Sequence, residues 1–150
     1  MVLHTRKRQR GNALIEAALA FTVLCPMFIG TFQFGLGFLY YNELANTVRS
    51  AARYAALQTY TSSTSTPASS FSDAVKNIAV YGNPAGGTTP VVPGLQTSNA
   101  SLVVTFLNGV PSTMDVSITN YQMDMVFTKI MLNKPKATFA YVGHYAPPVN

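Results

Sequence analysis

An uncharged run from Ala17 to Tyr41 constrains the fold of this chain more than any other feature of the sequence. As a helix, the run would be about 37 Å long at a rise of roughly 1.5 Å per residue, enough to cross a hydrocarbon core of about 30 Å. A buried helix of a soluble domain can have the same composition, but the rest of the chain is too small to surround it. The run therefore predicts a membrane-spanning helix.

Charged residues are distributed unevenly on the two sides of this run. Four basic residues precede it (Arg6, Lys7, Arg8 and Arg10), whereas the six basic residues elsewhere in the chain are nearly balanced by five acidic ones. Because Lys and Arg mark the cytoplasmic end of a span, we expect the N-terminus in the cytoplasm and the C-terminal two-thirds outside it. No basic stripe interleaved with aromatic residues is present, so no nucleic-acid partner is expected.

The N-terminal third of the sequence predicts one long helix at residues 12–59, which is membrane-spanning at about 17–41 and amphipathic at 42–59. Pro26 lies inside the span, where we expect it to kink the helix without ending it. The lone cysteine, Cys25, excludes an intramolecular disulfide. In the second half, apolar residues recur at helical spacing: Leu44, Val48, Ala51, Ala52 and Ala55.

The remaining residues, 60–150, predict a small extracytoplasmic head of the α+β class. A polar loop at 59–70, a short helix at 71–81 and a turn-rich stretch at 82–94 come first. Three antiparallel strands follow, at 100–107, 113–120 and 137–145, and the amphipathic helix should close their core. The side chains expected in this core are Phe106, Val116, Ile118 and Phe139. A change of alternation at Tyr121 suggests a bulge or a new element.

The junction between the basic leader, residues 1–11, and the apolar helix contains two unusual residues. Gly11 has a low helix propensity, and Glu16 places an ionisable group at the start of the span, where a lone charge is costly. Two interpretations are open. Either Glu16 reaches the lipid headgroups or pairs with Arg10 of its own chain, or cleavage after Gly11 creates an α-ammonium group on Asn12 that pairs with Glu16 of a neighbouring helix.

Gly11, with Glu16 five positions later and a short basic leader before it, resembles the prepilin-peptidase signal of type IV pilins and pseudopilins. The apolar segment with Pro26, the Phe-Gly step at 34–35 and the Ala-rich helix at 42–55 narrow the resemblance to TadE-like proteins of the tight-adherence (Flp) pilus system. The resemblance implies a pilin-like fold, leader cleavage between Gly11 and Asn12, and Glu16 as the residue recognised between subunits.

The resemblance also implies the cellular setting. We expect a single-pass protein of the bacterial inner membrane, incorporated into a surface pilus or retained beside it. The implied partners are other pilin subunits, inner-membrane pilus-assembly proteins, the prepilin peptidase and membrane lipid. Ala17 replaces the aromatic residue that small Flp pilins carry, and Gln33 replaces a glutamate of the TadE pattern. Together with the length, these differences favour a minor pilin or pseudopilin over a major subunit.

No feature of the sequence indicates an enzyme, and we expect no metal or cofactor. The two histidines, the lone cysteine and the scattered acids do not form a recognisable ligand or catalytic pattern. Two alternatives to the pilin interpretation stay open. One is an assembly factor whose helix never leaves the bilayer, and the other is a secreted binding domain behind a signal peptide. The length of the apolar run argues against the second, because signal cores span about 7–15 residues.

Overall fold

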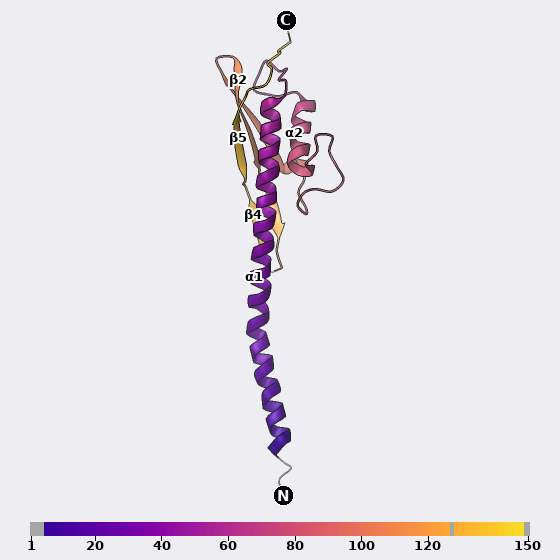
Figure 1. Cartoon of the computed structure of the whole chain (residues 1–150), viewed down its shortest axis with the longest axis vertical. Helices are drawn as coiled ribbons and strands as arrows, with labels where there is room; N and C mark the ends of the chain where they lie inside the picture. The colour runs from indigo at the N-terminus through magenta and orange to yellow at the C-terminus, as the bar shows by residue number, and fades with distance from the viewer. Residues whose placement is uncertain (1–4, 127, 149–150) are drawn as a thin grey trace. The chain divides into compact units, whose positions relative to one another are not determined.

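The computed structural model describes residues 5–126 and 128–148 of the chain, with side chains from residue 11 onward (Figure 1). Residues 1–4 of the expected leader lie outside this range, as do the leader's basic side chains. The chain divides into two compact units, Met1–Gly37 and Phe38–Asn150, and helix α1 (Thr5–Leu57) contributes to both. The other elements are α2 (Ser69–Tyr81), a 3-10 turn (Thr97–Asn99), β1 (Ala100–Leu107), β2 (Val110–Ile118), β3 (Tyr121–Asp124), β4 (Lys129–Leu132) and β5 (Lys136–Ala140).

The described part of the first unit is helical. The helix begins at Thr5, seven residues before the predicted start, and continues through Pro26. Because proline has no N–H, the carbonyl of Thr22 loses its usual helical donor there. The hydroxyls of Thr22 and Thr31 donate to the carbonyls of Ala18 (2.8 Å) and Met27 (2.9 Å), each one turn earlier. Hydroxyls satisfied inside their own helix are compatible with a lipid environment.

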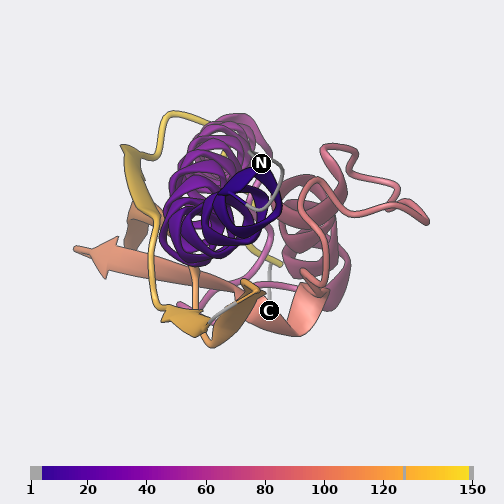
Figure 2. The ribbon, with the colours of Figure 1, turned by 90° about the horizontal axis from the view of Figure 1, so that it is seen from below.

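The second unit contains the hydrophobic core, and the part of α1 that belongs to this unit supplies one wall of it. The five apolar positions predicted from helical spacing are all completely buried: Leu44, Val48, Ala51, Ala52 and Ala55. Figure 2 shows α2 on one side of this helix and the strands on another. Alanine at three of the five positions lets neighbouring elements approach the helix closely. The predicted amphipathic helix therefore closes the core as expected.

The strands form two antiparallel sheets, a three-stranded sheet in the order β1-β2-β5 and a hairpin of β3 and β4. Asn108 and Gly109 both have positive φ (52° and 80°) and join β1 to β2 by a tight turn, which an Asn-Gly pair favours. Asn120 also has positive φ (54°) and separates β2 from β3, so the altered alternation at Tyr121 marks a new strand. Strand β4 was not predicted from the sequence. The α+β class and the long helix with a small antiparallel head are confirmed.

The predicted core residues differ in how deeply they are buried. Val116 and Ile118 of β2 are buried, as expected, whereas Phe106 is only half-buried and packs against the core. Phe139 was expected in the core, but 37% of it is exposed. Phe139 lies on β5, an edge strand, directly across from Met114 of β2, and Met114 is completely buried. The central strand thus fills the core position that the edge strand was expected to occupy.

The C-terminal segment fastens the end of α1 to the sheet. The N–H of Val142 donates to the carbonyl of Ala56 (3.0 Å), and the hydroxyl of Tyr141 donates to the carbonyl of Gln58 (3.0 Å). These bonds satisfy carbonyls that a helix end leaves without partners. A side chain at Gly143 would collide with the Gln58 carbonyl oxygen, so this crossing requires glycine. The segment therefore fixes where α1 ends in the second unit.

Candidate membrane and assembly segment

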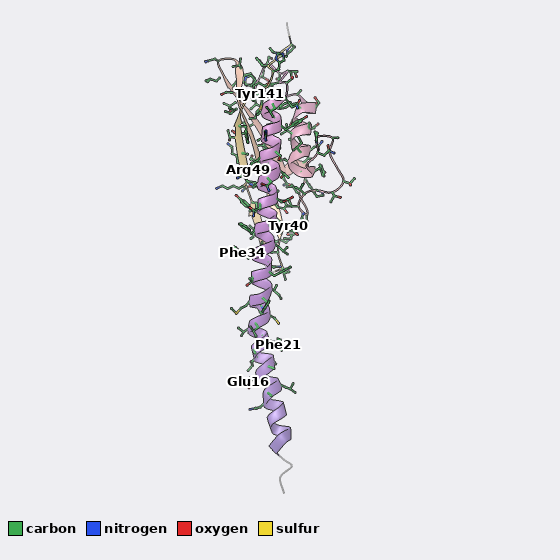
Figure 3. All side chains as sticks on the ribbon, viewed as in Figure 1. Glu16, Phe21, Phe34, Tyr40, Arg49 and Tyr141 are labelled. Carbon is green, nitrogen blue, oxygen red and sulfur yellow. The ribbon has the colours of Figure 1, made fainter. Side chains whose placement is uncertain are left out.

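The first unit exposes an apolar helix surface. Every side chain from Gly11 to Phe32 is exposed, and Phe28 and Phe34 are among the most accessible apolar residues, at 76% and 77%. Figure 3 shows Glu16, Phe21 and Phe34 following one another along this helix. Soluble monomers rarely expose contiguous apolar patches larger than about 300–600 Å². This surface therefore requires a cover of lipid or of other protein helices.

One helix of the described residues is long and apolar enough to cross a membrane, and none of its apolar window is buried. A core helix of a soluble protein would have the opposite property, because its apolar residues would be covered by the rest of the chain. The exposed window therefore favours a membrane anchor over a buried core helix.

Gly11, Asn12 and Glu16 lie on this exposed surface, at the N-terminal end of the part of α1 whose side chains the structure describes. A Cβ added at Gly11 would meet nothing within 4 Å, so the fold itself places no steric demand for glycine there. Glu16 is exposed. It makes no salt bridge with a basic side chain among the side chains that the structure describes, and the first of these basic residues is Arg49. Asn12 and Glu16 are one helical turn apart and so share a face. The two interpretations of Glu16 therefore both stay open.

The second unit contains a group of cations that the sequence did not reveal as a site. Arg49 of α1 lines a pocket together with Lys134 and Lys136, which flank the start of β5. These residues are far apart in the sequence and become neighbours only through folding. The one local signal is the pair of lysines around Pro135. Within the described residues, no group of three His, Cys, Asp or Glu side chains is placed to hold a metal ion.

A comparison with known families finds a match that lies on α1. Residues 11–53 match the family model of TadE-like proteins. The TadE-like segment begins at Gly11, includes Asn12, Glu16 and Pro26, and ends four residues before α1 does. It confirms the resemblance expected from the sequence and indicates a protein associated with the Tad pilus. No curated protein and no solved structure matches the chain.

Proposed function

We propose that this chain is a minor pilin or pseudopilin of a tight-adherence (Flp) pilus or a related secretion machine. The observation that carries the proposal is the exposure of every side chain from Gly11 to Phe32, the apolar first half of the TadE-like segment. In the bilayer, residues 17–41 are covered by lipid, with the basic N-terminus in the cytoplasm and the head outside. After leaving the bilayer, the same surface is covered by the helices of other pilin subunits.

The proposed assembly route requires two further steps. The prepilin peptidase removes residues 1–11, because a leader with four basic residues cannot enter an apolar helix bundle. The new α-ammonium group on Asn12 then pairs with Glu16 of an adjacent subunit. Inner-membrane pilus-assembly proteins extract the helix from the lipid. The chain has no catalytic role in this route and uses no cofactor.

A membrane-resident assembly factor is the second candidate. The hydroxyls of Thr22 and Thr31 are satisfied inside the helix, so these two polar groups do not oppose a span that stays in lipid. This candidate needs neither cleavage at Gly11 nor an intersubunit partner for Glu16. The two candidates therefore differ in the N-terminus of the mature protein.

The test is intact-mass and N-terminal analysis of the chain isolated from its native host. We expect the mature chain to begin at Asn12, and the Gly11→Leu variant to keep its leader. Gly30→Leu is the matched control, because Gly30 lies on the same helix and a Cβ there also meets nothing within 4 Å. An intact N-terminus in the wild-type chain would favour the membrane-resident factor. Cleavage beyond residue 30 would instead indicate a secreted domain.

A further inference from the structure

A pocket of about 390 Å³ lies in the second unit, between α1 and the segment that leads into β5. Its walls come from two parts of the chain: Tyr41, Asn42, Ala45, Asn46 and Arg49 on α1, and Lys134, Pro135 and Lys136 opposite them. The α1 residues recur at helical spacing and so form one stripe along the helix. Every polar group in the lining is a cation, an amide or a phenol, and none is acidic.

The charge of the pocket is strongly positive. Arg49 (Figure 3) and Lys134 make no salt bridge with the side chains of residues 11–126 and 128–148. Lys136 has a partner, since its Nζ lies 3.1 Å from Oδ2 of Asp115. Burial alone would raise the pKa of Asp115, but the neighbouring Thr138 and Lys136 outweigh burial and lower it, so Asp115 is ionised at neutral pH. Among the described side chains, Arg49 and Lys134 therefore have no acidic partner and can bind an anionic ligand.

The backbone around the cations is held in place without any ligand. Pro135 is buried, and its carbonyl accepts a hydrogen bond from the N–H of Ile118 (3.0 Å). The side-chain oxygen of Asn133 accepts another from the N–H of Asn120 (2.9 Å). On the opposite wall, the completely buried Val48 fixes the helix turn that carries Arg49. The site is therefore preorganised, and binding requires little more than ordering of the long side chains.

The pocket begins where the apolar run of the sequence ends. Tyr41 is the last residue of the expected span, and the other α1 residues of the pocket occupy the next two turns. Tyrosines gather where a span meets the headgroup region of a bilayer, and the exposed Tyr41 occupies that place in this sequence. In the sequence, the α1 residues of the pocket therefore follow the expected span directly.

We propose that this pocket binds the phosphate of an anionic phospholipid headgroup in the outer leaflet of the membrane that the helix crosses. Arg49 and Lys134 supply the charge, with the guanidinium of Arg49 suited to two parallel hydrogen bonds to phosphate oxygens. The amides of Asn42 and Asn46 donate to the remaining oxygens. Basic pockets beside a span recognise such headgroups in this way. The proposal rests on the membrane insertion proposed above and adds the identity of the lipid.

The experiment uses the full chain in uncharged detergent micelles and follows unfolding of the head by circular dichroism. Short-chain phosphatidylglycerol, phosphatidylcholine and inorganic phosphate are titrated separately. Of these three compounds, we expect only phosphatidylglycerol to raise the melting temperature of the head at low concentration. The double variant Arg49→Gln, Lys134→Gln should bind it at least about tenfold more weakly. Arg53→Gln is the matched control, since Arg53 is exposed on the same helix but does not line the pocket.

Two results would overturn the proposal. Equal affinity of the double variant and the wild-type chain for phosphatidylglycerol would exclude this pocket as the site. An equal effect of inorganic phosphate at the same concentration would show a general anion site instead of a lipid site. Membrane insertion is tested separately, by alkaline extraction of the wild-type chain from phosphatidylcholine vesicles. Extraction of the chain would refute the proposed function, whereas the comparison in micelles depends only on the pocket.

Discussion

A chain shortened to residues 38–150 should unfold cooperatively, whereas one that begins at residue 60 should not hold its sheet. The second unit starts at Phe38, and its core includes the completely buried Leu44 and Val48 of α1. Burial of one such side chain contributes roughly 1.5–3 kcal/mol. A domain has a free energy of unfolding of only about 5–15 kcal/mol. The stabilisation lost with the whole buried face of the helix should therefore exceed the free energy of unfolding of the head.

Circular dichroism and thermal melting of the two purified fragments test this prediction. Within the 38–150 fragment, Leu44→Asn should abolish the melting transition by placing an amide in the core. Arg53→Asn should leave it nearly unchanged, because Arg53 is exposed on the same helix. If the 60–150 fragment melted at the same temperature as the 38–150 fragment, the helix would not be part of the core of the head.

Glu16→Gln should leave leader cleavage intact and abolish stable association with other pilin subunits. After cleavage, Asn12 carries an α-ammonium group that is mostly cationic at neutral pH. In a bundle of apolar helices, the best partner for this group is a carboxylate on a neighbouring subunit. Removal of one partner from a desolvated ion pair costs about 3–5 kcal/mol, because the other charge stays buried. That loss of free energy is enough to make a weak assembly of subunits dissociate.

Co-purification of two differently tagged copies of the chain from the native host distinguishes an ion pair between subunits from an ion pair within one helix. Asn12 and Glu16 are also neighbours on one helix face, but loss of a pair inside one chain would leave contacts between the copies unchanged. Glu43→Gln is the matched control, since Glu43 is an exposed acid on α1 outside the apolar run. If Glu16→Gln were cleaved and the copies associated as in the wild type, the intersubunit pair would be disproved.

Local patterns were sufficient for the parts of the fold that a single segment determines. The buried face of α1 follows from apolar residues at helical spacing, and the β1–β2 turn follows from Asn108 and Gly109. The short strand β4 could not be predicted in this way. None of its residues is fully buried, so it has no alternation between buried and exposed side chains. Its pairing with β3 decides its structure.

The two candidate sites also differ in how far the sequence alone could predict them. Gly11 and Glu16 are close together in sequence, so their residue types at the junction and the resemblance to a known signal were enough to point to them. The basic pocket combines Arg49 with Lys134, and only folding brings these two together. The misplacement of Phe139 has a related cause, because strand order determines which of two facing residues is covered.

Cysteine accessibility in cells of the native host tests most directly whether the TadE-like segment crosses the membrane with the head outside. Cys25 is the only cysteine of the chain and lies in the apolar run, so the wild-type thiol should react with a membrane-impermeant maleimide only after detergent is added. In a Cys25→Ser background, Ser63→Cys places a thiol on an exposed loop of the head. We expect that thiol to react in spheroplasts before lysis. Reaction only after lysis would place the head in the cytoplasm and contradict the account.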